Sequence, residues 1–426
     1  MDILLVTSNL GLPESPSSNH ICDRIECLRR YRDINVYGIT ESHPQMPCGI
    51  PIRVIESGVS GRCEALVLKT FNQFQKYHIL GNNDVLALRE FLREYRSRLF
   101  QKVKSDRIDK FGNWSLIPTY EKAIAETIRD DGFDLIYSTG GPATVHIAVA
   151  RALEGTDLPW IAEIQDPLLF EDIEGPYMAS KRDVDHLRLA EECLKKADAV
   201  VCLTEACAEY YKDRLGKTSV HSIYPGANIG RVPAREPKQT RQTSGKVNIF
   251  HGGTLAGDRN LHVLLEAIRD EDLSEKISLT LAGYIDEKVR EQISSLPFVY
   301  YLGIVSRDEA LCQITNSNVC LVVQNRSSIS RYTIPSKFYE YISLSSPVLF
   351  LGYDNNEVRK NSSAYNFYYC DQRDLSEVSA CLRQVVSDHH SESIKQPVNI
   401  DIAQATNQFV ELCRKVSRLN AGSLSP

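Results

Sequence analysis

The chain has 426 residues, 42% of them hydrophobic and 24% charged, a balance ordinary for a globular protein of two to three domain-sized units. Its net charge of −6 argues against nucleic acid as a partner, and no apolar run reaches the roughly 18 residues that cross a bilayer. The 12 cysteines are scattered without a C-x-x-C pair, which favours buried thiols in a reducing compartment and predicts no metal site.

The chain opens with a β-α-β pattern. Residues 2–8 are an apolar run typical of a buried strand, and residues 34–39 form a second strand after an amphipathic helix. This order predicts a parallel sheet. The loop at residues 9–19 contains Gly11 but no G-x-G-x-x-G, so it does not indicate a dinucleotide site. Because the first residues lack the basic segment of a signal peptide, we expect a cytoplasmic protein.

A helical insertion is predicted at about residues 66–113. Its segment Arg89–Lys110 is rich in cations, with apolar residues interleaved at roughly helical spacing. Two interpretations remain open. The segment is either a surface for anionic lipid or a lipid-linked acceptor, at the inner face of a membrane, or a solvated helix whose apolar stripe packs inward. The second is the more ordinary.

Two further strands of the first half end in residues suited to ligand binding. Residues 134–138 run into the turn Thr139-Gly-Gly-Pro and a helix that holds His146, and residues 159–164 end just before Asp166. Open α/β sheets bind their ligands at the carboxyl ends of the strands. Asp166 therefore either faces the reaction centre or caps the loop that follows it.

The second half starts a new αβ series. Residues 229–246 are polar, basic and without a strand pattern, as expected of a linker, and a strand begins at Val247. Glycines after a strand let the backbone approach a ligand, and Arg259 offers a planar fork of donors to phosphate oxygens. The residues of this kind that follow the strand beginning at Val247 are Gly252, Gly253 and Arg259.

The stretch 332–350 (YTIPSKFYEYISLSSPVLF) predicts a loop, a short helix and a buried strand. Pro335 suits a helix start, and Ser336 and Lys337 add amides and a cation where the helix dipole attracts anions. Glu340 lies on another helix face, where it can accept hydrogen bonds from a ribose diol. The ordinary alternative is an αβ unit with an exposed glutamate.

The stretch PSKFYEY…PVL resembles the donor-binding motif of family 4 glycosyltransferases, which have the GT-B fold. The turn Pro225–Asn228, the Gly252 entry and the Gly303 strand end resemble further motifs of that family in the same order. Many members carry two glutamates eight positions apart. Glu340 matches the second, whereas Tyr332 stands at the first.

The resemblance implies an α/β protein with the GT-B architecture, two doubly wound Rossmann-like domains facing each other across a cleft. It implies sugar transfer from a UDP- or GDP-linked donor to a glycan or lipid-linked glycan, as in polysaccharide biosynthesis, with retention of configuration and without metal or cofactor. The expected catalytic residues are Asp166, Arg259 and Lys337, and the acceptor side holds Gly11, Gly140, Gly141 and His146. The expected donor-binding residues are Gly252, Gly253, Thr254, Arg259, Gly283, Val305, Tyr332, Pro335, Ser336, Lys337 and Glu340.

The predicted organisation is an acceptor-side domain at residues 1–228, a linker at 229–246, a nucleotide-sugar-binding domain at 247–400, and a terminal helix and tail at 401–426. In this fold such a helix commonly crosses back to the first domain. Two other functions remain open. The protein could be a UDP-sugar 2-epimerase, which shares the fold. Because Tyr332 replaces the first motif glutamate, it could also be a non-catalytic nucleotide-sugar-binding partner of an active homologue.

Overall fold

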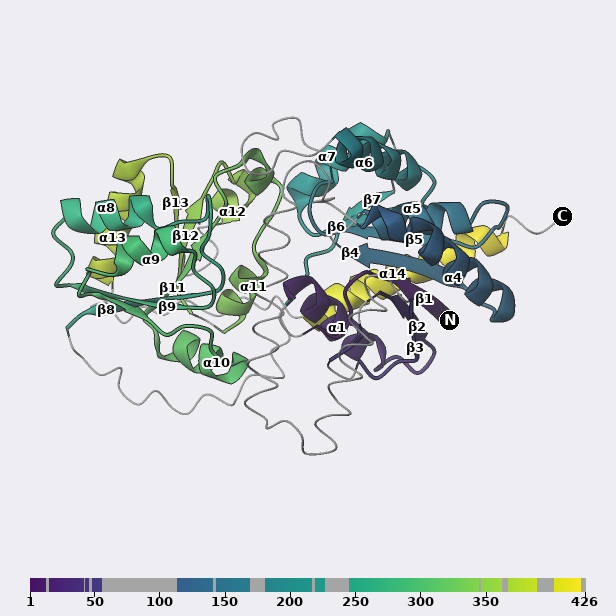
Figure 1. Cartoon of the computed structure of the whole chain (residues 1–426), viewed down its shortest axis with the longest axis horizontal. Helices are drawn as coiled ribbons and strands as arrows, with labels where there is room; N and C mark the ends of the chain where they lie inside the picture. The colour runs from purple at the N-terminus through teal and green to yellow at the C-terminus, as the bar shows by residue number, and fades with distance from the viewer. Residues whose placement is uncertain are drawn as a thin grey trace, which may run out of the picture. The chain divides into compact units, whose positions relative to one another are not determined.

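The computed structural model describes residues 1–12, 15–41, 43–45, 48–55, 113–140, 143–168, 181–216, 219–226, 245–344, 346–361, 367–388 and 402–422. They contain two sheets with flanking helices (Figure 1). Residues 1–163, 177–200 and 416–426 form one compact unit, and residues 164–176 and 201–415 form the other. The predicted basic segment 89–110, nearly all of the linker and Gly141 lie outside the described residues.

The first sheet has seven strands in the order β3-β2-β1-β4-β5-β6-β7. Its strands are β1 (Asp2–Val6), β2 (Asn35–Thr40), β3 (Ile52–Val54), β4 (Leu135–Gly140), β5 (Trp160–Ile164), β6 (Ala199–Cys202) and β7 (Val220–Ser222). β1 pairs in parallel with both β2 and β4, which confirms the predicted opening. The strand order reverses between β1 and β4, and open sheets of this type bind ligands at the carboxyl ends of such strands.

The helices of this half begin at recognisable signals. Ser15 caps α1 with its side chain and Pro16 is the first helical residue, while Thr204 caps α7 and Gly216 ends it with φ +61°. The helices are α1 (Pro16–Leu28), α4 (Ile117–Asp130), α5 (Thr144–Ala152), α6 (Lys181–Leu194) and α7 (Glu205–Leu215), with the 3₁₀ turn η1 (Trp114–Leu116).

The second sheet has six strands in the order β10-β9-β8-β11-β12-β13, and all its neighbouring pairs are parallel. They are β8 (Val247–Gly252), β9 (Ile277–Ala282), β10 (Val299–Tyr301), β11 (Val319–Val323), β12 (Val348–Gly352) and β13 (Phe367–Asp371). The associated helices are α8 (His262–Asp270), α9 (Glu287–Ile293), α10 (Arg307–Asn316), α11 (Ser336–Ser343), α12 (Asn356–Asn361) and α13 (Leu375–Asp388), with the 3₁₀ turn η4 (Ser328–Arg331). Two parallel, helix-flanked sheets confirm the predicted fold class.

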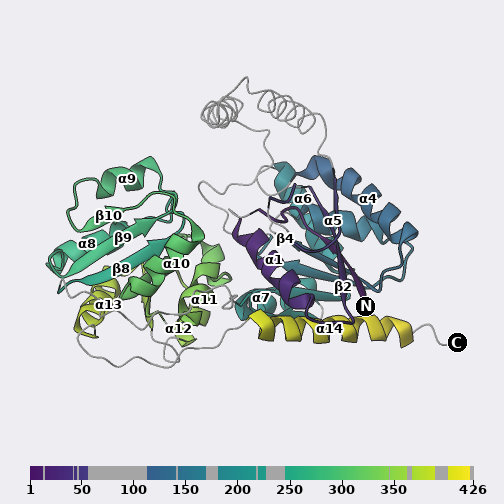
Figure 2. The ribbon, with the colours of Figure 1, turned by 90° about the horizontal axis from the view of Figure 1, so that it is seen from below.

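The chain ends in α14 (Ile402–Gly422), which Figure 2 shows as one long helix. Residues 416–426 belong to the first compact unit, and the Ser417 hydroxyl lies 3.8 Å from the sulfur of Met1. No helix of the described part is long and apolar enough to cross a membrane.

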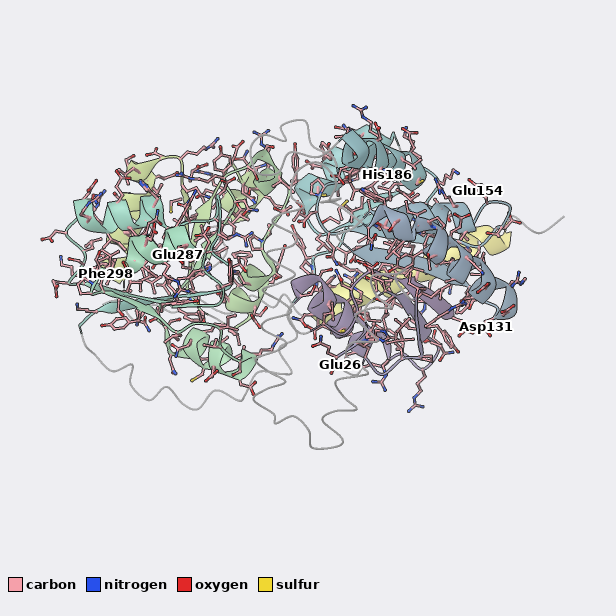
Figure 3. All side chains as sticks on the ribbon, viewed as in Figure 1. Glu26, Asp131, Glu154, His186, Glu287 and Phe298 are labelled. Atoms are coloured by element: carbon pink, nitrogen blue, oxygen red, sulfur yellow. The ribbon has the colours of Figure 1, made fainter. Side chains whose placement is uncertain are left out.

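Figure 3 draws the described side chains on the ribbon and labels Asp131, Glu287 and Phe298. Asp131 and Glu287 are exposed, whereas Phe298 is 7% exposed and belongs to the apolar core of the second unit. Strands β4, β5 and β6 are buried along their whole length, as expected of a parallel sheet covered on both faces.

An ion pair lies inside the first unit. The guanidinium of Arg24 in α1 binds the carboxylate of Glu163 in β5 and the hydroxyl of Tyr137, at 2.7 Å, while Thr139 donates to Glu163 at 2.7 Å. Burial alone would raise the pKa of Glu163, but Arg24, His20 and Thr139 hold it well below its usual range. Glu163 is therefore a carboxylate, and it ties α1 to the end of β5.

Glu163→Gln should lower the free energy of unfolding by about 3 kcal/mol, because it leaves the Arg24 charge buried without its counter-ion. Urea unfolding followed by circular dichroism measures this loss. The matched control is Glu192→Gln, which breaks an exposed pair with Lys195 and should cost well under 1 kcal/mol. Equal losses in the two variants would contradict a stabilising role for the buried pair.

Candidate anion-binding site

Helix α11 is fixed by its apolar face. Phe338, Tyr339, Tyr341 and Ile342 are buried, and the Phe338 ring meets Phe350 of β12 edge to face at 5.4 Å. Pro335 lies at the N-cap, directly before the helix, and not inside its first turn as the sequence suggested. The packed face thereby sets the direction in which the N-terminus of the helix points, with the amides of Ser336 and Lys337 in its first turn.

The glycines predicted to approach a ligand lie together at the carboxyl ends of β8 and β9. Gly253 has φ +140° and Gly283 has φ +110°, both unfavourable for other residues, and a Cβ on Gly283 would overlap the carbonyl of Gly253. The backbone N–H of Gly252 donates to the hydroxyl of Tyr341 at 3.2 Å, which ties this turn to α11.

Lys337 reaches this glycine turn. A Cβ on Gly253 would overlap its ammonium nitrogen, so the lysine occupies the space that the missing side chain leaves. Its Nζ is buried and has no hydrogen-bond partner among the described residues. Burial first, and the charge of Arg259 second, lower the pKa of Lys337 to about 7, while Glu340 opposes the shift. A cation held in this way favours the arrival of an anion.

Glu340 is paired on the outer side of α11. Its Oε1 lies 3.1 Å from Nη2 of Arg307, the first residue of α10, and both side chains are partly exposed. The sequence reasoning identified Glu340 but missed Arg307, although the run Ser306-Arg-Asp-Glu carries a helix-capping signal. A ligand that contacts Glu340 would meet this arginine as well.

The loop before α11 is held by two amide side chains. Gln324 donates to the carbonyl of Thr333 at 2.7 Å, and Asn355 donates to the carbonyl of Ser330 at 2.7 Å. Tyr332, at the position of the missing glutamate, is half-buried in this loop. Of the other expected donor-binding residues, Thr254 and Ser336 are exposed and Val305 is half-buried.

The expected acceptor-side residues have different surroundings. Gly11 lies in the loop after β1 and Gly140 is the last residue of β4, both with positive φ, +69° and +144°. His146 is fully buried, its Nδ1 lies 2.9 Å from the Ser138 hydroxyl, and burial lowers its pKa to about 4. Asp166 is exposed just beyond β5, at the edge where ligands are expected, and Gly141 lies outside the described residues.

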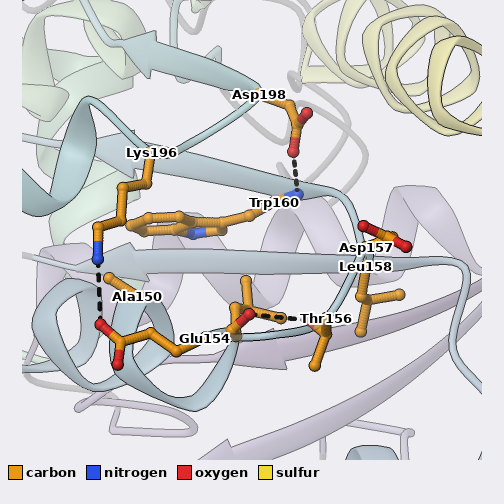
Figure 4. Close-up of a pocket in the computed structure, with 9 residues that line it drawn as sticks. Ala150, Glu154, Thr156, Asp157, Leu158, Trp160, Lys196 and Asp198 are labelled. Atoms are coloured by element: carbon orange, nitrogen blue, oxygen red, sulfur yellow. Dashed lines mark hydrogen bonds and ion pairs between the residues drawn. The ribbon is translucent and has the colours of Figure 1, made fainter. Parts of the chain in front are cut away.

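A pocket elsewhere in the first unit lies at the amino end of β5 (Figure 4). It is lined by Trp160, by the end of α5 and by the turn before β6, where Lys196 pairs with Glu154 at 3.1 Å. None of the predicted site residues lines it. Because it opens at the amino edge of the sheet, it is not where such a fold binds its ligand.

The described residues include no group of three or more His, Cys, Asp or Glu side chains placed to hold a metal ion. Lys337 and the neutral His251 lie beside Gly253, and the positive charge of Arg259 acts on Lys337. This chemistry suits a phosphate or diphosphate.

The family model for Glycosyltransferase Family 4 matches residues 81–231. The structure resembles that of a glycosyltransferase from Rickettsia africae, with a TM-score of 0.64, 11% identity and 97% of this chain and 98% of that chain covered. It also resembles HepE of Anabaena in complex with UDP-glucose, with a TM-score of 0.59, 14% identity and coverage of 97% and 100%. UDP-GlcNAc 2-epimerase of Neisseria meningitidis, bound to UDP-GlcNAc, has a TM-score of 0.52, 12% identity and coverage of 97% and 100%. Among curated proteins, none matches this sequence.

The fold shared with these structures is that of GT-B enzymes, and it confirms the predicted architecture. The match to the family model covers residues 81–231 and points to the glycosyltransferase class. The fold is common to transferases and an epimerase, so the reaction has to be argued from the site.

Removing the buried amine should stabilise the ligand-free protein. Lys337→Met should raise the free energy of unfolding by about 1 kcal/mol at pH 6–7, because the folded state no longer buries an ammonium without a partner. The pKa of Lys337 is lower in the folded state, about 7, than in the unfolded state, so its cost is full below pH 7 and fades as the pH rises towards 10. Chemical unfolding of both proteins from pH 6 to 10 measures the difference, with the exposed Lys122→Met as control. A gap that widens with pH would contradict this account.

Proposed function

We propose that this protein transfers a sugar from a nucleoside-diphosphate sugar, UDP- or GDP-linked, to a glycan or lipid-linked glycan acceptor. The observation that carries the proposal is the Lys337 amine, which is buried against Gly253 beside Arg259 without a hydrogen-bond partner among the described residues. A diphosphate supplies the acceptor oxygens and the negative charge that this place lacks.

In the proposed reaction, the bond from the anomeric carbon to the diphosphate oxygen breaks and a bond to the acceptor hydroxyl oxygen forms. The acceptor hydroxyl releases its proton to solvent, and the nucleoside diphosphate leaves with one more negative charge. Arg259, Lys337 and the α11 amides bind that charge more strongly in the transition state than in the ground state. Asp166 is the candidate that orients the acceptor. The family resemblance favours retention of configuration, and the cationic groups favour action without a metal ion.

Glu340 and the neighbouring Arg307 are assigned to the nucleoside. The carboxylate accepts hydrogen bonds from the ribose hydroxyls, and the base lies towards Gly303 and Val305, which follow β10. The support is the Arg307–Glu340 pair, which brings the start of α10 against α11 next to the end of β10.

The clamp is tested by Arg259→Ala and Lys337→Ala. Each should lower kcat/KM for transfer by about 10²-fold or more, and the double variant should lose less than the product of the two, because both side chains address one diphosphate. Initial rates with UDP- and GDP-sugars, with and without EDTA, measure this, and EDTA should leave the wild-type rate unchanged. The control is Arg269→Ala, an exposed cation of α8. Wild-type turnover in either clamp variant, or a strict need for a divalent cation, would contradict the proposal.

The nucleoside contact is tested by Glu340→Gln, which should weaken binding of the bare nucleotide and of the nucleotide sugar alike, by about 1–3 kcal/mol. Titration calorimetry with UDP and GDP measures both affinities. Glu287→Gln, on the exposed face of α9, is the control. Unchanged affinity for the bare nucleotide would remove Glu340 from the site.

The same assays separate the alternatives. A free epimerised nucleotide sugar formed without acceptor would identify a 2-epimerase, and tight binding without transfer or hydrolysis would identify a non-catalytic binding partner.

A further inference from the structure

His251 lies at the end of β8, directly before the glycine turn, and its side chain is fully buried. Its Nδ1 lies 2.9 Å from the carbonyl oxygen of Leu321 in β11. A carbonyl only accepts, so Nδ1 carries the hydrogen. Burial first, and the charges of Lys337 and Arg259 as well, keep the pKa of His251 well below its usual range. The imidazole is therefore neutral, and the lone pair is on Nε2.

The Nε2 of His251 and the Nζ of Lys337 face the same small space. A Cβ built on Gly253 would lie 3.9 Å from the first nitrogen and would overlap the second. Both nitrogens are buried, and neither has a hydrogen-bond partner among the described residues. One is an acceptor with a fixed lone pair and the other is a donor, so the two nitrogens are complementary.

We propose that His251 is a positioning residue for the lysine of the diphosphate site. When an anion binds, His251 Nε2 accepts one N–H of the Lys337 ammonium and leaves the other two directed at phosphate oxygens. The inference rests on the proposed function, because it takes a nucleoside diphosphate as the anion. The donor motif of the sequence does not contain this histidine.

The charged surroundings give the interaction a pH dependence. From the loop after β8, Arg259 disfavours a second cation, while Glu340 on α11 favours it and is itself paired with Arg307 of α10. The Tyr341 hydroxyl is already bound to Gly252. With a pKa of about 7, Lys337 is near half-protonated in the empty site at neutral pH.

Anion binding therefore takes up a proton. The contribution of Lys337 to the affinity should be constant below pH 7 and fall about tenfold per pH unit above it, until the pH reaches the pKa of Lys337 in the complex. A hydrogen-bond acceptor at His251 stabilises the Lys337 ammonium in the complex and therefore raises the pKa of Lys337 there. Loss of the acceptor should weaken binding most at low pH, where the lysine is charged, and least at high pH, where it is neutral.

The test is titration calorimetry with UDP or GDP, whichever binds the wild type more tightly, from pH 6 to 9 in buffers of different ionisation enthalpy. Wild-type protein should take up a fraction of a proton at pH 7, rising towards one as the pH increases. His251→Phe should bind about tenfold more weakly at pH 6–7, with a difference that narrows above pH 8 and a smaller proton uptake there. His251→Gln keeps an acceptor and should stay within about threefold of wild type with its proton uptake intact.

The outcomes distinguish failure of the proposed function from failure of the role proposed for His251. Failure of both nucleotides to bind the wild type, or wild-type affinity in Lys337→Met, would overturn the proposed function. If the wild type binds and Lys337→Met does not, then wild-type affinity and proton uptake in His251→Phe would overturn this inference alone. Equal weakening of binding by His251→Phe and His251→Gln at every pH would also overturn this inference, because a packing defect would have that effect. Thermal unfolding checks that the variants fold, and His251→Leu replaces the Phe variant if that one does not.

Discussion

The site depends on one constraint, the burial of a lysine amine where a glycine leaves room for it. Lys337 lies against Gly253, whose φ of +140° and missing side chain make that space available. A cation in such a place raises the free energy of the empty protein and lowers that of a complex with an anion. This unfavourable free energy is located at the amine whose charge a bound anion would neutralise. Such an uncompensated cost is typical of functional sites and unusual elsewhere in a core.

The surrounding structure makes this arrangement stable. The buried rings on α11 pack against β12, and the Tyr341 hydroxyl holds the turn at Gly252. On the far side of that turn, β8 is paired with β9 and β11 in the middle of a parallel sheet. Lys337 therefore cannot leave the turn by a simple shift of the helix. Apolar packing, which is not directional, offsets the cost of a directional polar site.

Much of this could be predicted from the sequence, because strand ends and helix starts have local signatures. The glycines after β8 and β9, the start of α11 at Pro335-Ser336 and the alternation of strands with helices were predicted from local patterns, and the structure shows them.

What could not be predicted are pairs joined only by the fold. Arg24 and Glu163 are 139 residues apart, and nothing in either segment indicates its partner. His251 and Lys337 also lie in separate segments of the sequence. A charged residue within an apolar strand, such as Glu163 in WIAEI, was a usable signal, because a buried carboxylate requires a counter-ion.

The proposed diphosphate half of the site does not by itself choose between transfer and epimerisation. Both reactions of a nucleotide sugar can break the bond to the diphosphate, and both need cations for the leaving group, so Lys337, Arg259 and the α11 amides serve either one.

The choice depends on groups beside the sugar ring. Epimerisation at C2 needs acids and bases converging on that carbon, whereas transfer needs a hydroxyl oriented towards the anomeric carbon. His251 is buried and neutral, and it shares the space beside Gly253 with Lys337, so the proposed positioning role sets it apart from groups that act on the sugar ring. His146 is fully buried beside Ser138 and cannot serve as such a base in this conformation. Asp166 is the one carboxylate among the expected catalytic residues Asp166, Arg259 and Lys337, and one carboxylate suits the orientation of a hydroxyl better than the paired acid and base of an epimerase.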